Sequence, residues 1–196
     1  MALLTRLGFP GDEKYWATLG FATDGAMTRI GTISCALGVP ASWGFDGINV
    51  DAGILGIPEQ LRDAGEPGTH PNGVTSVDHV VYWVPDLDRS VADLSAVLGT
   101  APRRRFRPRG PDGPEMAFYR VGEAFIEVVA AGHRPPALAG IAFSAPDLDA
   151  TVATIRAADG PIGTPKPAVQ GGRIASVWHG YLDWGIAFME PKPRTP

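Results

Sequence analysis

Two residues in the middle of the chain, His79 and Glu127, have side chains suited to metal-dependent or acid–base chemistry. His79 lies within VDHVVYWV and Glu127 within EAFIEVVA, and the other residues of both segments are mostly β-branched, aromatic or otherwise apolar. Such segments favour strands. A carboxylate on a buried strand face needs a cation, a proton or an ion-pair partner. Imidazole and carboxylate together suit zinc, nickel, manganese or iron, so both residues are candidate metal ligands.

A short repeat indicates which elements position these residues. The stretch VVYWVPDLDRSVADL at residues 80–94 is matched by IAFSAPDLDATVATI at residues 141–155. In each copy the proline ends a strand, because it cannot donate to a sheet ladder. The aspartate after it is a candidate cap for a helix in which apolar residues recur every three or four positions. Strand-like segments with Gly or Pro turns follow both helices. The chain therefore predicts the unit β-α-β-β-β, written twice.

The repeat also aligns the two copies. With the prolines of the two PDLD stretches superposed, Gly140 stands where the first copy has His79. With AFIEV placed over AFMEP, Glu190 stands where the first copy has Glu127. On this alignment the second copy keeps the carboxylate and lacks the histidine.

Strand alternation gives each candidate an aromatic neighbour on its own face, because residues two apart share a face. These neighbours are Trp83, Phe125 and Phe188. We expect them to wall an apolar substrate-binding cavity, although a packed core uses the same residue types. The same alternation places Val77 on the face of His79.

The pattern resembles a module of the vicinal oxygen chelate superfamily, which includes glyoxalase I, extradiol dioxygenases, methylmalonyl-CoA epimerase and the fosfomycin and bleomycin resistance proteins. The resemblance rests on the histidine within VDHVVYWVPDLD, a helix ending in LG, and the glutamate near the end of AFIEVV. It covers residues 77–191 well and residues 1–64 faintly. It implies an α+β fold in which paired βαβββ modules form curved mixed sheets and a cup.

Carried over residue by residue, the resemblance implies one divalent metal ion (Zn, Ni, Mn or Fe) held by His79, Glu127 and Glu190, with no ligand at Gly140. Three protein ligands leave positions for substrate oxygens and water. The resemblance also implies that a carboxylate at a ligand position, Glu127 or Glu190, serves as ligand or as catalytic general base. The chain would then be a glyoxalase-like lyase, isomerase or dioxygenase acting on a small oxygenated organic molecule. The alternative is a non-catalytic small-molecule binding protein of the drug-sequestering, bleomycin-resistance type, without metal.

Each candidate also has a purely structural interpretation. A lone strand histidine is often a hydrogen-bonded core or surface residue. Glu127 would be neutralised by an ion pair with an arginine such as Arg120 or Arg173. Glu190 directly precedes the C-terminal PKPRTP, where it would be exposed.

The run RRRFRPR at residues 103–109 contains five arginines. Arginines on an edge strand usually face solvent and prevent association between sheets. The other interpretation is that one of them faces the cup and binds the carboxylate or phosphate of an anionic substrate through its planar guanidinium. The choice depends on strand register, which the sequence does not specify.

The predicted glyoxalase-like domain spans residues 77–196, with modules at 77–133 and 137–191, and the turn-rich residues 65–76 form a linker before it.

Residues 1–64 are predicted to form an N-terminal αβ segment. KYWATLGF has helical spacing, and FDGINVDAG followed by PEQLRDAG resembles a strand and a helix. RIGTISCAL at residues 29–37 matches RVGEAFIEV at residues 120–128. The segment is therefore either a degenerate third module or an unrelated αβ extension.

Composition limits the classes of function. The chain has 196 residues, 44% of them hydrophobic, and 17 basic against 21 acidic side chains give a net charge of −4, which argues against a broad nucleic-acid surface. The single cysteine, Cys35, cannot form an intrachain disulfide. No signal peptide or membrane span is recognisable. We expect a cytoplasmic protein with a small-molecule substrate or ligand, and the resemblance implies a homodimer.

Overall fold

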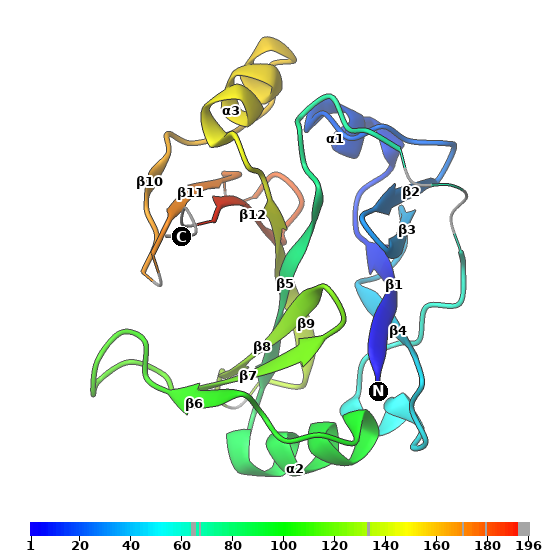
Figure 1. Ribbon diagram of the computed structural model, residues 1–196, viewed down its shortest axis with the longest axis vertical. Helices are drawn as coiled ribbons and strands as arrows, with labels where there is room; N and C mark the ends of the chain where they lie inside the picture. Colours follow the sequence, from blue (N-terminus) through cyan, green and yellow to red (C-terminus); the bar gives the residue numbers. More distant parts are fainter. Residues whose placement is uncertain (64–65, 67, 133, 170, 179, 192–196) are drawn as a thin grey trace, which may run out of the picture.

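The computed structural model describes residues 1–63, 66, 68–132, 134–169, 171–178 and 180–191. These residues form two mixed sheets, a smaller N-terminal one and a larger one that begins at residue 76. Figure 1 shows the N-terminal sheet alongside β5 (Ser76–Val84), while β6 (Arg104–Phe106) and β10 (Lys166–Pro167) extend away on the other side. Among the described residues no helix is long and apolar enough to cross a membrane.

The larger sheet contains two β-α-β-β-β units. The first consists of β5, α2 (Leu87–Leu98), β6, β7 (Met116–Val121) and β8 (Ala124–Ala130). The second consists of β9 (Ala137–Ser144), α3 (Leu148–Ala157), β10, β11 (Arg173–Ser176) and β12 (Gly185–Glu190). The strand order is β10-β11-β12-β9-β5-β8-β7-β6. In each unit the first strand runs parallel to the last, and β5 and β9 join the units antiparallel. The predicted α+β fold of paired modules is confirmed.

The repeated Pro-Asp-Leu-Asp has the predicted structural role in both units. Asp86 caps α2 by accepting a hydrogen bond from the backbone N–H of Arg89 at 2.9 Å, and Asp147 caps α3 by accepting one from Ala150 at 2.9 Å. Gly99 ends α2 in the left-handed conformation, with φ 64°. These residues stop a strand and start a helix, and they take no part in a site.

The N-terminal sheet repeats part of this arrangement. It consists of β1 (Leu3–Phe9), β2 (Met27–Ile30), β3 (Ile33–Leu37) and β4 (Ser42–Asp46), with α1 (Glu13–Thr18) between β1 and β2. β1 pairs parallel with β3, β3 pairs antiparallel with β2, and β4 pairs antiparallel with β1. β5, β8, β7 and β9 pair in the same way. A degenerate third module would have this pairing. That residues 1–64 are such a module stays a prediction.

The helix expected within PEQLRDAG is wrong for residues 58–63, which are not helical. The short 3₁₀ helix η1 (Ala52–Leu55) precedes them, and they then run along the edge of the N-terminal sheet. The backbone N–H of Gln60 donates to the Trp43 carbonyl at 2.9 Å, and Arg6 Nε donates to the Gln60 carbonyl at 3.1 Å. These bonds satisfy the backbone in an extended form, so helical spacing is overridden by tertiary pairing.

Aromatic side chains join the two sheets. Phe143 of β9 lies 4.8 Å from Phe21 and 6.2 Å from Phe9, measured between ring centroids, and Tyr82 of β5 lies 4.9 Å from Trp43. The Tyr82 hydroxyl donates to the Leu55 carbonyl at 2.6 Å, and burial raises its pKa to about 12. The N-terminal sheet and the helices therefore cover one face of the larger sheet. The opposite face, called the open face below, remains for a site.

Candidate functional site

In the first module, the open face consists of the side chains that alternate away from the core on four neighbouring strands. They are His79, Val81 and Trp83 on β5, Phe125, Glu127 and Val129 on β8, Met116, Phe118 and Arg120 on β7, and Arg104 and Phe106 on β6. Six of them form an apolar cluster separate from the main core: Val81, Trp83, Phe106, Met116, Phe118 and Val129. His79 and Glu127 therefore border an apolar surface.

A β-bulge determines how β5 presents its histidine. The register of β5 against β9 shifts between Val77 and His79. Val77 is consequently fully buried in the main core, so the expectation that it shares the face of His79 is wrong. Bulges reorient side chains and are frequent next to active sites. Asp78 and His79, although adjacent in sequence, are brought together, with Asp78 Oδ1 2.7 Å from His79 Nδ1.

His79 and Glu127 face each other across β5 and β8. His79 Nε2 lies 4.0 Å from Glu127 Oε2, and the two side chains are 19% and 17% exposed. A carboxylate at Nδ1 favours the tautomer that carries its proton there. Nε2 is thereby directed at Glu127. The three side chains form a short chain of proton-binding groups that reaches the open face.

Neither arginine considered as a structural partner of Glu127 pairs with it. Arg120 Nε donates to the Gly122 carbonyl at 2.6 Å, and its guanidinium lies 4.6 Å from the centre of the Phe125 ring. Arg173 pairs with Glu190 and Asp149 instead. Among the residues described by the structure, the basic side chain within 4.0 Å of the Glu127 carboxylate is His79.

Glu190 lies on the other face of the sheet. Its Oε2 accepts from Arg173 Nε at 2.7 Å, and its Oε1 accepts from Arg173 at 2.9 Å and from the Leu148 backbone N–H at 3.3 Å. Arg173 holds the pKa of the Glu190 carboxyl below its ordinary value, because the guanidinium stabilises the charged form. The Glu190 carboxylate is thus bound to Arg173 and to the first turn of α3, away from His79 and Glu127.

Strand register explains why Glu127 and Glu190 lie on opposite faces of the sheet. Val81 is opposite Glu127 in the first module. Its counterpart in the second, Ala142, is opposite Ala187. Ala187 therefore takes the place equivalent to Glu127, and the alignment of AFIEV with AFMEP is displaced by three residues. An odd displacement moves a side chain to the opposite face.

The three predicted aromatic residues also lie on different faces of the sheet. Phe188 is fully buried against Phe143 and Phe21 on the covered face. Trp83 and Phe125 lie half-buried on the open face, and the guanidinium of Arg134 lies 5.3 Å from the centre of the Trp83 ring. The structure therefore brings Trp83 and Phe125 to the side of His79 and Glu127, but not Phe188.

Gly140 faces the backbone of β12 directly. A Cβ at Gly140 would come within 2.5 Å of the Gly185 carbonyl oxygen and 2.9 Å of the Gly185 Cα. Any side chain at this position would force the two strands apart, because backbone cannot give way as a flexible side chain can. The missing histidine thus follows from close strand packing.

These positions do not assemble the three-ligand metal set implied by the resemblance. His79 and Glu127 supply two donors, Gly140 has no side chain, and Glu190 is held by Arg173. Within the described part of the chain, no group of three or more His, Cys, Asp or Glu side chains could hold a metal ion. We therefore derive the chemistry of the site from the protein groups.

Sequence reasoning overlooked Asp78. An acidic residue directly before the candidate histidine was a visible signal, but regular strand alternation places adjacent residues on opposite faces. Only the bulge brings the carboxylate to the imidazole.

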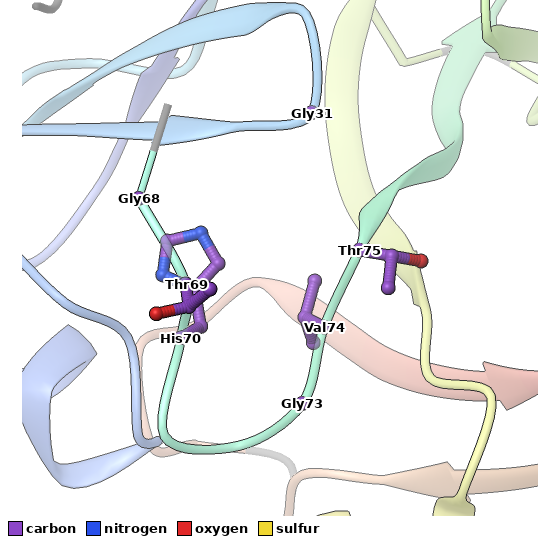
Figure 2. A pocket seen from close by; sticks show the side chains of 7 residues that line it. All are labelled: Gly31, Gly68, Thr69, His70, Gly73, Val74 and Thr75. Atoms are coloured by element: carbon purple, nitrogen blue, oxygen red, sulfur yellow. The ribbon is translucent and has the colours of Figure 1, made fainter. Parts of the chain in front are cut away.

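Two surface hollows lie elsewhere, along the linker. One has a volume of about 290 Å³, and Figure 2 shows His70 and Val74 on the two arms of a bend beside the Gly31 turn. Both ring nitrogens of His70 are engaged, Nδ1 with the Ala22 backbone N–H at 3.2 Å and Nε2 with the Arg29 carbonyl at 3.0 Å. Burial lowers the pKa of this imidazole. His70 therefore anchors the linker and is poorly placed for chemistry.

Comparisons with known proteins agree with this architecture. A sequence model of the Glyoxalase/Bleomycin resistance protein/Dioxygenase superfamily matches residues 78–176. Methylmalonyl-CoA epimerase from Mycobacterium tuberculosis is 22% identical with a TM-score of 0.53, and the match covers 62% of this chain and 91% of that one. A hypothetical protein from Bacillus halodurans is 16% identical with a TM-score of 0.52, covering 62% and 97%.

A third similar structure is a variant of Streptomyces coelicolor methylmalonyl-CoA epimerase in complex with 2-nitronate-propionyl-CoA. It is 18% identical with a TM-score of 0.51, and the match covers 63% of this chain and 99% of that one. At these identities the likeness concerns the fold. A search of curated protein sequences gave no match.

Proposed function

Because the chain belongs to the Glyoxalase/Bleomycin resistance protein/Dioxygenase superfamily, we propose that it is a glyoxalase-like enzyme of the isomerase type. It would move a proton on a carbon next to an oxygen-bearing group of a small organic molecule that lies on the open face. The observation that carries this proposal is the Asp78–His79–Glu127 arrangement, with 2.7 Å between the first two side chains and 4.0 Å between the last two.

Each side chain has a defined part in the proposed reaction. Glu127 accepts the proton from the substrate carbon at Oε2, as a general base. His79 exchanges that proton through Nε2, and Asp78 stabilises the resulting imidazolium through Nδ1–H. Return of the proton from His79, to the other side of the carbon once the planar intermediate has turned over or to a neighbouring atom, gives the isomer. The apolar cluster around Phe118 and Val81 limits water near the reacting carbon.

Two further points support an isomerase over a lyase or a dioxygenase. The solved methylmalonyl-CoA epimerases have the same fold, and an epimerase is an isomerase. One scaffold hosts many reactions, so this support is at the level of fold alone. The second point is the site itself, in which acid–base groups lie within reach of one another and the described residues form no group of three metal donors.

Deuterium exchange tests the proposal. The protein is incubated in D₂O with small carbonyl compounds that carry an exchangeable hydrogen, beginning with methylmalonyl-CoA, and deuterium uptake at the carbon is followed by NMR. Glu127→Gln should lower the exchange rate about 10²- to 10⁴-fold, the usual range for a general base. Glu190→Gln is the matched control and should leave the rate unchanged. Asp78→Asn should cause a smaller loss, about 10- to 100-fold, as for other groups that orient a histidine.

A non-catalytic binding protein is the second candidate function. The aromatic surface of the open face, with half-buried Trp83 and Phe106 beside buried Phe118, favours it. Binding of a compound without exchange of its hydrogen, or equal exchange rates in Glu127→Gln and Glu190→Gln, would favour this function over the enzyme.

A divalent metal ion, a cytoplasmic location and a homodimer stay predictions. Elemental analysis of the tag-free protein and of the His79→Ala/Glu127→Ala variant tests the first. Fractionation of the native cells tests the second, and sedimentation velocity tests the third.

A further inference from the structure

We propose that Arg104 forms an anion-binding subsite on the open face, which holds the carboxylate or phosphate of an organic anion with an apolar body. The proposed function places the reacting carbon of the same molecule over His79 and Glu127, and that part of the proposal rests on it. The subsite itself rests on the register, the charges and the surroundings of β6.

The register of β6 separates the arginines of the run at residues 103–109. Arg104 is opposite Phe118, a member of the open-face cluster, and Phe106, two residues further, belongs to the same cluster. Arg104 therefore lies on the open face. Arg105 lies on the opposite side, where it contacts Asp88 at 2.6 Å and Glu115 at 2.7 Å. One arginine is thus a structural ion-pair partner and its neighbour faces the site.

The charge of Arg104 is available to a ligand. It forms no ion pair with any residue that the structure describes, whereas the acidic side chains nearest to β6, Asp88 and Glu115, bond to Arg105. Glu127 lies beside His79, and Asp78 bonds to the imidazole. A guanidinium without an internal carboxylate binds an external carboxylate or phosphate by paired, charge-assisted hydrogen bonds.

Two other cations border the same surface. The guanidinium groups of Arg120 and Arg134 lie over the rings of Phe125 and Trp83, at 4.6 Å and 5.3 Å from the ring centres. They add positive charge at the margins of the apolar cluster. The combination of an apolar floor and cationic margins suits an anion that also carries an apolar group.

Strand geometry gives the size of that apolar group. Arg104, Phe118 and Glu127 are successive partners across β6, β7 and β8. Two strand spacings separate the backbone of Arg104 from that of Glu127, which is about 10 Å. The Phe118 ring lies between them and stacks on Phe106, with 5.4 Å between ring centroids. A molecule that contacts both ends therefore has an apolar segment between its anionic group and its reacting carbon.

Calorimetric titration with three probes tests the subsite: 3-phenylpropionate, phenyl phosphate and the neutral isostere 3-phenylpropanamide. The wild type should bind at least one anion more tightly than the amide. Arg104→Ala should weaken binding of that anion at least tenfold, without changing binding of the amide. Arg105→Ala is the matched control and should stay within about twofold of the wild type, because Arg105 lies on the other side of β6. Urea unfolding of each variant confirms that it is folded.

The titration results decide between the outcomes. Preference for 3-phenylpropionate identifies a carboxylate subsite, and preference for phenyl phosphate identifies a phosphate subsite. Equal affinity for the amide and both anions, no binding of either anion, or an equal loss in Arg104→Ala and Arg105→Ala would overturn the proposal. The titration measures binding alone and needs no turnover, so failure of the deuterium-exchange experiment leaves the binding result independent.

Discussion

The two modules of the larger sheet have the same topology and very different open faces. The first presents His79 and Glu127 from its paired first and last strands. The second presents Gly140 and Ala187 at the equivalent places. The same strand pairing thus carries a histidine and a glutamate in one module and residues without a titratable side chain in the other. The difference teaches that the fold supplies positions, while close packing and register determine which positions can carry chemistry.

The N-terminal sheet extends the comparison. Arg6 is opposite Ser34 on β1 and β3, as His79 is opposite Phe125 on β5 and β8, in sheets with the same pairing. Arg6 donates to the carbonyls of Gln60 and Phe45 and to Asp46, which lies 2.8 Å away. The site position of the first module therefore corresponds in the N-terminal sheet to a residue that binds β4 and the segment around Gln60.

The largest expected difference between the modules is in the free energy of unfolding that is lost when an aromatic residue is replaced by alanine. Phe188→Ala should lower the free energy of unfolding by about 3–5 kcal/mol, because it empties a fully buried position. Phe125→Ala, which removes a half-buried ring from the open face, should cost about 1 kcal/mol or less. Urea unfolding of both variants measures the difference. Equal losses would mean that the two faces are not distinguished by burial.

The second prediction concerns the close approach of β9 and β12. Gly140→Ala should destabilise the protein by about 1–3 kcal/mol, because its methyl group would overlap the Gly185 carbonyl. Gly185→Ala should cost less, since its nearest contact would be at 3.2 Å. The urea midpoints of the two variants give the comparison. A neutral Gly140→Ala would show that packing does not exclude a side chain there.

The smallest expected effect is the pH dependence of stability that Glu190 contributes. A carboxyl whose pKa is depressed on folding contributes stability above its ordinary pKa, and this stability is lost as the pH falls through the lower value of the folded state. Arg173 depresses the pKa of Glu190, so the wild type should lose part of its stability as the pH falls below about 4.3, the ordinary pKa of glutamate.

The matched variant isolates this contribution. Glu190→Gln should lose less stability on acidification than the wild type, because it lacks the carboxyl group whose pKa Arg173 depresses. Melting temperatures between pH 7 and pH 3 measure the difference. Parallel curves for Glu190→Gln and the wild type would contradict the role assigned to Arg173.

Local sequence signals predicted most of the fold. The β-branched segments, the prolines after them and the capping aspartates were sufficient to place both helices and the strands of both modules except the short β10, because these features act over a few residues. The helix expected near Gln60 failed, because hydrogen bonds to Trp43 and Arg6, distant in sequence, stabilise an extended backbone there.

For the site, the sequence by itself determined the residue types: a histidine and a glutamate on apolar strands, and a run of arginines. Tertiary structure decided which of them meet. A bulge brings Asp78 to His79, register moves Glu190 and Phe188 to the covered face, and the pairing of β6 with β7 places Arg104 and not Arg105 beside the site. The physical reason is that a strand alternates its faces with a period of two, so a shift of one or three residues, invisible in a short motif, reverses which side each residue occupies.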